Sequence, residues 1–430
     1  MKVFLISLVI ILKSNFILAN ELIFYVDSSY KNNPRLNAER ESYKAEKENI
    51  KISRSDFLPN VTISGDKTSI TSTNRTNQSG VSLSDSNSDT ETRTLSVDQK
   101  IFQGLEGYNT LKKSKLEAEK AKFKLKDIEQ DVILETTIAY YDLLYKINNE
   151  TFNLANVDIF ERQVESDSIR LQKGEITLTD LAQSESSLAG ANAKLIKAKT
   201  ELLTAKTNFK KITSLEAPKN IEISPVLNIS LPQNLNVALQ KANINNPKLI
   251  MSRLDYEISK KNVQIETAKI SPSASLNYSK SKKNDFSSTV DETNEESVKA
   301  TITWPILSGG KNYSSIRKSK YKKSQNNLLL TNSINEVKSQ TTNAWSIYQS
   351  SESVLLATEA QVKAAEIANE GITLEYDSGN TRTTLEVIQS RSLLLDARIA
   401  NAKAERDLII SKFKLLSQLG ELNIENIKSL

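Results

Sequence analysis

The pentapeptide NNPRL at residues 32–36 returns as NNPKL at residues 245–249. The two neighbourhoods match in order and in kind, because a Lys- and Glu-rich stretch follows each copy and leads to a proline and an alternating apolar and polar run. That proline lies the same distance downstream in both copies, at Pro59 and Pro272. The chain therefore consists of one structural unit written twice, and a fold assigned to one half must also suit the other.

The duplication covers nearly the whole chain. IFQGLEGYNTLKKSK at 101–115 resembles ILSGGKNYSSIRKSK at 306–320. Further on, AYYDLLY at 139–145 resembles AWSIYQS at 344–350. Prolines between the halves break helices and indicate an extended linker. These landmarks predict a leader at 1–19, a first repeat at 20–213, a linker at 214–236, a second repeat at 237–421 and a C-terminal tail at 422–430.

The N-terminus has the pattern of a secretory signal peptide. Lys2 precedes an apolar run from residue 3 to residue 12, and Ala19 offers a small residue for cleavage. The run is too short to span a bilayer as a helix, and a buried N-terminal helix is the alternative. No later segment has about eighteen uninterrupted apolar residues, so any membrane-embedded part is expected to be a β-barrel.

The chain has no Cys and no His. This absence removes thiol nucleophiles, imidazole general bases, Ser-His-Asp triads and nearly every zinc site. The Gly309-Gly310 pair lacks the continuation that a P-loop needs. We therefore expect no enzyme activity and no catalytic, cofactor-binding or metal-binding residues. A formal net charge of +5 is mild and gives no reason to expect nucleic acid as a partner.

Each half carries two stretches in which apolar and polar residues alternate, the pattern of half-buried strands. The apolar positions are Val61 and Ile63, then Leu95, Val97 and Ile101, and in the second half Ala274, Leu276 and Tyr278, then Val298, Ala300, Ile302 and Trp304. Each strand is expected to have about ten residues, the length that a tilted strand needs to cross a bilayer. The connections at 73–91 and 284–297 are rich in Ser, Thr, Asn and Asp and are expected to be loops.

The remaining segments predict long helices, in the first half from about Asn33 to Phe57, Gly104 to Leu171 and Thr179 to Thr213. Large residues recur every seventh position in the last of these, at Leu181, Leu188, Leu195, Leu202 and Phe209. The second half repeats this seam at Ile388, Leu395, Ala402, Ile409 and Leu416. Such seams favour coiled coils, with ordinary core-facing helices as the alternative.

Two hairpins supply only four strands, which cannot close a barrel with room inside, and an open sheet in lipid leaves unpaired backbone groups. Three copies supply about twelve strands, enough for a closed barrel with a lumen. We therefore predict a mainly α fold with a small β portion, in which each protomer has duplicated halves, long antiparallel coiled-coil helices and four transmembrane β-strands. The trimer would form a barrel of about twelve strands that continues into an α-helical tunnel.

These features together resemble one known family. The N-P-x-L segments, the proline before each first strand, and the turns QKGEITLTD and DSGNTRTTLE are similar to those of the TolC-like outer-membrane channel-tunnels of bacterial efflux pumps and type I secretion systems. The match is closest at 376–407. The resemblance implies a homotrimer in outer-membrane lipid and a tunnel through the periplasm. Its tip would open when a periplasmic adaptor (membrane fusion) protein and an inner-membrane pump or ABC transporter engage it.

The resemblance also implies a gate at the tip. Thr179 and Asp180 match the acceptor pair that holds the family's tip closed. Tyr376 matches the tyrosine that bonds to that aspartate within a protomer, and Arg382 matches the arginine that reaches a neighbour's pair. An Arg–carboxylate bond is directional and can be exchanged for other contacts. The alternatives are that Asp180 caps a helix and that Arg382 is a solvated surface charge.

Glu386 matches the first of two acidic positions that ring the narrow entrance in some members of the family. Three copies would favour cations and offer a site for multivalent blockers. Gln389 replaces the second acid, so a weaker ring is expected, and an exposed helix glutamate is the alternative. The second turn holds one more residue before Glu386 than the first turn holds before Asp180, which leaves the register of Arg382 open.

The main interpretation is a passive outer-membrane exit duct that extends into the periplasm, is gated at its periplasmic tip and takes its energy from a partner. The alternative is a periplasmic coiled-coil adaptor or scaffold that never enters the membrane. The paired amphipathic hairpins favour the duct.

Overall fold

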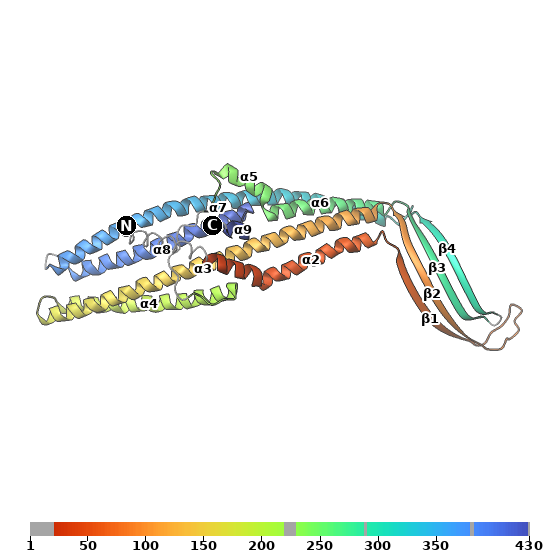
Figure 1. The fold of residues 1–430 in the computed structure, drawn as a ribbon, viewed down its shortest axis with the longest axis horizontal. Coiled ribbons are helices and arrows are strands. Elements are labelled where there is room, and N and C mark those ends of the chain that lie inside the picture. The colour runs from red at the N-terminus through yellow and green to blue at the C-terminus, as the bar shows by residue number, and fades with distance from the viewer. Residues whose placement is uncertain (1–20, 219–228, 288–289, 379–381, 429–430) are drawn as a thin grey trace, which may run out of the picture. The chain divides into compact units, whose positions relative to one another are not determined.

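Figure 1 shows the fold in the computed structural model, which describes residues 21–218, 229–287, 290–378 and 382–428. The predicted leader at 1–19 lies outside these ranges, as does the middle of the predicted linker. Residues 21–32 are helical, and the elements that follow are α2 (Pro34–Ser55), β1 (Asn60–Ser72), β2 (Ser86–Gln103), α3 (Glu106–Gln172), α4 (Leu178–Thr213), α5 (Leu235–Asn245), α6 (Pro247–Ala268), β3 (Ser273–Ser287), β4 (Val290–Thr303), α7 (Lys311–Asp377), α8 (Thr384–Leu419) and α9 (Ile424–Lys428).

Corresponding helices of the two repeats have equal lengths. α2 and α6 have 22 residues each, α3 and α7 have 67, and α4 and α8 have 36. The long helices predicted from the sequence are therefore confirmed, with ends close to the expected ones. Equal lengths also mean that each position in one helix has a counterpart at the same distance from the start of the other.

The repeated N-P-x-L motif starts α2 and α6. Asn33 Oδ1 accepts a hydrogen bond of 3.2 Å from the backbone N–H of Leu36, and Asn246 Oδ1 accepts one of 3.2 Å from that of Leu249. An Asn before the first helical residue satisfies free N–H groups, and proline suits the first position because its missing N–H would have no partner there. Leu36 and Leu249 are both buried. The motif occurs twice because each repeat starts a helix and anchors it at this point.

The four strands form one antiparallel sheet in the order β1-β2-β3-β4. Paired residues of antiparallel strands point to the same face, and neighbours along a strand point to opposite faces. One row across the sheet is apolar and consists of Val61, Val97, Tyr278 and Val298. The next row, on the opposite face, consists of Thr62, Ser96, Ser279 and Ser297. The predicted division into an apolar face and a polar face is confirmed.

The strands are longer than expected. They have 13, 18, 15 and 14 residues, against a predicted length of about ten. Much of 284–297 and the end of 73–91, both predicted as loops, belong to strands. Charged side chains pair across β3 and β4 there, such as Lys282 with Glu292 at 3.0 Å and Lys283 with Glu295 at 3.1 Å. Such cross-strand pairs stabilise a sheet without leaving an apolar pattern in the sequence, which explains the error.

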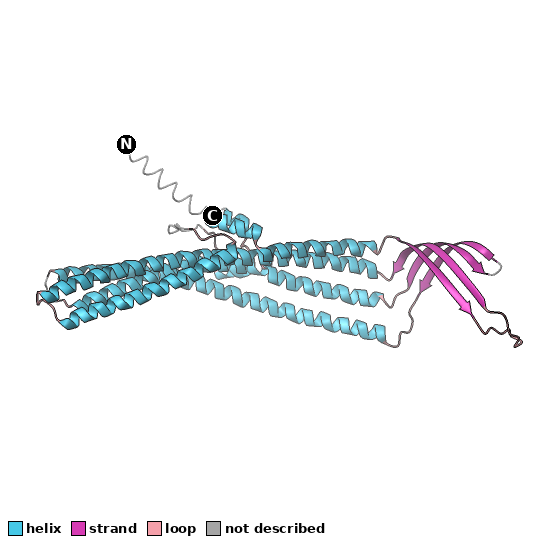
Figure 2. Ribbon diagram, turned by 90° about the horizontal axis from the view of Figure 1, so that it is seen from below, coloured by secondary structure: helices cyan, strands magenta, loops and turns pink. Residues whose placement is uncertain are grey.

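The described residues form two compact units. The first consists of Ser42–Lys122 and Met251–Thr331 and contains the whole sheet. In this unit α2, α3, α6 and α7 all join the sheet at the same end (Figures 1 and 2). All four connections between strands and helices therefore lie at one end of the sheet, and the strands connect only to one another at the other end.

The second unit holds the other described residues, including the hairpins α3–α4 and α7–α8. Its apolar contacts include a cluster of Val157, Phe160, Ala191 and Leu195, with Leu188 and Ile388 packed against it. The buried residues of α4 include the predicted seam positions Leu195, Leu202 and Phe209, together with the small residues Ser184, Ala191 and Ala198. Within the described ranges, no helix is apolar over a length that would take it across a bilayer.

Candidate functional site

The tips of the two hairpins begin their second helices through the same local structure. Thr177 caps α4, because its Oγ1 accepts from the N–H of Asp180 (3.3 Å) and its own N–H donates to Asp180 Oδ2 (2.9 Å). Thr383 and Glu386 form the same reciprocal pair at the start of α8, at 3.3 and 2.8 Å. These capping boxes satisfy free backbone groups and fix where each helix starts.

The capping boxes stabilise both carboxylates in their ionised form. Two hydrogen bonds from Thr177 lower the pKa of Asp180. The bond from its hydroxyl has the larger effect and the bond from its backbone N–H the smaller. The pKa of Glu386 is lowered chiefly by the backbone N–H of Thr383 and next by Arg382. Both acids carry charge near a helix N-terminus, where the helix dipole also favours negative charge.

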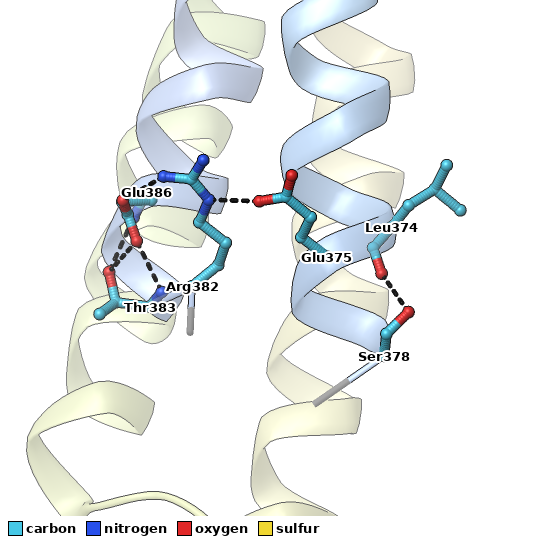
Figure 3. A network of polar contacts seen from close by, with 6 residues as sticks. All are labelled: Leu374, Glu375, Ser378, Arg382, Thr383 and Glu386. Atoms are coloured by element: carbon cyan, nitrogen blue, oxygen red, sulfur yellow. Dashed lines mark hydrogen bonds and ion pairs between the residues drawn. The ribbon is translucent and has the colours of Figure 1, made fainter. Parts of the chain in front are cut away.

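Arg382 connects the two helices of the second hairpin (Figure 3). Its Nε lies 2.6 Å from Glu375 Oε2 on α7, and its Nη1 lies 3.0 Å from Glu386 Oε1 on α8. The two carboxylates, Glu375 foremost, raise the pKa of the guanidinium. Thr179 and Gln389 lie exposed near the starts of α4 and α8. The second turn, in which the sequence has one extra residue, includes positions 379–381, which lie outside the described residues.

Tyr376 contacts a different aspartate from the expected one. The resemblance implied a bond to Asp180, but Tyr376 Oη donates to Asp167 Oδ1 at 3.0 Å and lies 3.1 Å from Thr384 Oγ1. The Arg170 guanidinium carbon lies 4.5 Å from the centre of the Tyr376 ring. Burial raises the pKa of the Tyr376 phenol, and the Asp167 carboxylate raises it further. The phenol is buried between helices, whereas Asp180 belongs to the exposed cap of α4.

Asp167 is the centre of a buried polar network. It is 0% exposed and accepts hydrogen bonds from Ser184 Oγ (2.5 Å) and Gln163 Nε2 (2.8 Å) as well as from Tyr376. Gln163 Oε1 accepts a bond of 2.8 Å from Arg391 Nη1. A buried carboxylate requires donors around it, and these come from α3, α4 and α7, while α8 joins through Arg391. One network therefore ties the hairpin of the first repeat to that of the second.

Asp167 was not among the site residues predicted from the sequence. The available signal was an acid on the buried stripe of α3, at helical spacing from Val157 and Phe160. Such an acid needs hydrogen-bond donors from neighbouring helices, but the sequence does not say which residues supply them. Chemically, the tip offers hydrogen bonds and ion pairs that can be exchanged. Among the described residues there is no group of acidic side chains suited to a metal ion.

The chain matches a protein-family model described as Outer membrane efflux protein over residues 26–214 and 238–421. It is 25% identical over 404 residues to the outer membrane efflux protein BepC of Brucella suis, covering 93% of this chain and 85% of that protein. It is 23% identical over 412 residues to the outer membrane protein TolC of Escherichia coli, covering 93% and 82%. The crystal structure of the Campylobacter jejuni CmeC outer membrane channel has the same fold, with a TM-score of 0.83, 17% identity and coverage of 95% of this chain and 88% of that one.

Proposed function

Because the chain belongs to the outer membrane efflux protein family, we propose that it forms the duct through which an inner-membrane pump expels its cargo. The protein is an outer-membrane transport protein that extends into the periplasm, and it is not an enzyme. The duct itself is passive, so the energy for transport comes from the pump.

The observation that carries this proposal is the exposed apolar face of the sheet. Ile63, Val298 and Ile302 expose 82, 70 and 79% of their surface and point to the same face as the apolar row described above. In a water-soluble protein such a face is normally covered, because contiguous exposed apolar surface is costly. Hydrocarbon is the environment in which this face is stable, and the polar face then suits a water-filled lumen.

The duct consists of three copies of the chain. β1 and β4 are the edge strands, each with one side unpaired within the chain. Unpaired backbone groups in hydrocarbon cost several kcal/mol each, which favours pairing of β4 of one copy with β1 of the next. Three copies supply about twelve strands, an even number within the range of outer-membrane barrels. A periplasmic adaptor and an inner-membrane pump or ABC transporter complete the assembly.

The hairpin tips form the gate of this duct. Within a protomer, the bond from Tyr376 to Asp167 joins the two hairpins. Between protomers, Arg382 gives up its ion pairs with Glu375 and Glu386 and binds the Thr179–Asp180 pair of the neighbouring copy. Glu386, with Gln389 one turn on, lines the entrance and favours cations. An adaptor that offers alternative partners for these groups would open the tip.

Planar-bilayer conductance of the protein extracted from outer membranes, with its mass measured in detergent, tests this proposal. We expect a trimer with small, cation-selective conductance at rest. A soluble periplasmic species, or a monomer without channel activity, would contradict the duct and support the alternative of an adaptor or scaffold.

A further inference from the structure

α3 and α7 are the helices that follow β2 and β4, and both begin with the same exposed pattern. Tyr108, Lys112 and Lys115 of α3 correspond to Tyr313, Arg317 and Lys320 of α7, at equal distances from the helix start. Positions i, i+4 and i+7 share one helix face, and all six side chains are exposed. An aromatic residue followed by two basic residues is therefore repeated at the end of the sheet where helices join it.

The charge on the α7 copy is not balanced. The chain has no acidic residue between Glu296 and Glu336, and α7 carries six basic residues in its first thirteen positions. Over the described residues, none of these six side chains lies within ion-pair distance of an acid. The start of α3 differs, because Lys113 pairs with Glu117 at 3.4 Å and Lys120 with Asp255 at 2.6 Å. The start of α3 also contains Glu106 and Glu117, whereas the start of α7 contains no acid, so the second repeat carries the larger excess of positive charge.

The segment between β4 and α7 adds a cavity beside this charge. A cavity of about 290 Å3 is lined by residues that include Ile270, Trp304, Pro305, Ile306, Gly310 and Tyr313. Trp304 is 62% exposed, and its Nε1 donates to the carbonyl of Ile270 at 3.2 Å. Ile306 and Leu307 are 79 and 86% exposed. Trp and Tyr with an apolar body and a polar edge are typical of the boundary between hydrocarbon and headgroups.

We propose that the junction of β4 and α7 binds the phosphate headgroup of an anionic phospholipid of the phosphatidylglycerol type, in the periplasmic leaflet of the outer membrane. Arg317 and Lys320 bind the phosphate. Trp304 and Tyr313 contact the part of the lipid between its headgroup and its acyl chains. This inference rests on the proposed function, because the apolar face of the sheet must lie in lipid for the junction to reach a leaflet. At the corresponding place in the first repeat, Glu106 and Glu117 offset part of the basic charge, which makes that site the weaker one for an anionic headgroup.

Trp304 is itself a probe of the site. The full-length trimer is placed in bilayers that contain brominated phosphatidylglycerol or brominated phosphatidylethanolamine, and the quenching of its fluorescence is compared between the two lipids. A Trp304→Phe variant supplies the signal of the other Trp, Trp345, for subtraction. We expect stronger quenching by phosphatidylglycerol, and the double variant Arg317→Gln/Lys320→Gln should lower that preference about fivefold or more. The double variant Lys112→Gln/Lys115→Gln removes equal charge on α3 and should leave the Trp304 signal unchanged.

Equal quenching by the two lipids, or a preference that the Arg317→Gln/Lys320→Gln variant retains, overturns the proposal. If the Arg317→Gln/Lys320→Gln variant keeps the preference for phosphatidylglycerol but changes the reversal potential of the channel, the two basic residues face the lumen instead. Inorganic phosphate at the concentration of the lipid should not abolish the preference, and loss of it would indicate a site for free anions. Absence of quenching by either lipid contradicts membrane insertion itself and so separates failure of the proposed function from failure of the lipid site.

Discussion

The hydroxyl of Tyr376, in the second repeat, donates a hydrogen bond of 3.0 Å to the fully buried carboxylate of Asp167, in the first repeat. This contact joins two hairpins that lie some two hundred residues apart in the sequence. Because Asp167 is screened from water, each of its donors contributes more than an exposed hydrogen bond does.

Tyr376→Phe removes one donor from Asp167 and keeps the ring. We expect the free energy of unfolding to fall by about 1.5–3 kcal/mol, the range for hydrogen bonds to charged groups. Resting conductance should rise, since the two hairpins are less firmly joined. Thermal unfolding and planar-bilayer recordings measure the two effects. Tyr321→Phe, at a 74% exposed position of the same helix, is the control and should change neither. Wild-type stability in Tyr376→Phe would show that the bond contributes nothing.

Arg382→Ser separates gating from stability. The ion pairs of Arg382 are exposed, so we expect little change in stability. Conductance should nevertheless rise, because the bond to the neighbouring copy is lost. Arg398→Ser is a matched control, since Arg398 also joins α8 to α7 through an exposed pair, with Glu366 at 2.8 Å. Equal conductance in the two variants would contradict the gate assigned to Arg382.

Glu386→Gln and Gln389→Glu should move ion selectivity in opposite directions. Gln preserves the capping box while it removes the charge, so the helix start is kept and cation preference falls. Gln389→Glu adds a second acid about one turn further along α8 and should strengthen cation preference and block by multivalent cations. Reversal potentials in a salt gradient measure both. Unchanged potentials in the pair would remove these residues from the entrance.

Asp127→Asn should stabilise the protein at neutral pH. Burial raises the pKa of Asp127, although Lys248 opposes the shift. A carboxyl with a raised pKa contributes stability that is fully present below its ordinary value of 3.8 and is lost as the pH rises through the folded value. The gain from Asp127→Asn should therefore be largest at pH 7 and vanish in acid. Unfolding temperatures measured across a range of pH test this prediction. Asp131→Asn is the control, because Arg35 Nη2 lies 3.0 Å from Asp131 Oδ2 and loss of this ion pair should lower stability.

Most of the fold could be predicted from the spacing of apolar residues in the sequence. Seam residues such as Leu195 and Phe209 are buried as expected, and the alternation at Val61 and Val298 marks the apolar face of the sheet. These patterns are local, since a repeat of seven or of two residues follows from the geometry of one helix or strand. The parts of the strands farthest from the helices were not predicted, because charged pairs such as Lys282 with Glu292 take the place of the apolar pattern there.

The sequence by itself therefore determined the duplication, the helix and strand order, and the motif that starts a helix at Asn33 and Asn246. It also located the hairpin tips, because turn and capping residues act within a few positions of one another. Only the tertiary structure decided that Tyr376 bonds to Asp167 and not to Asp180. That choice depends on which donors four packed helices bring to one buried carboxylate, and partners that distant are fixed by packing and not by spacing along the chain.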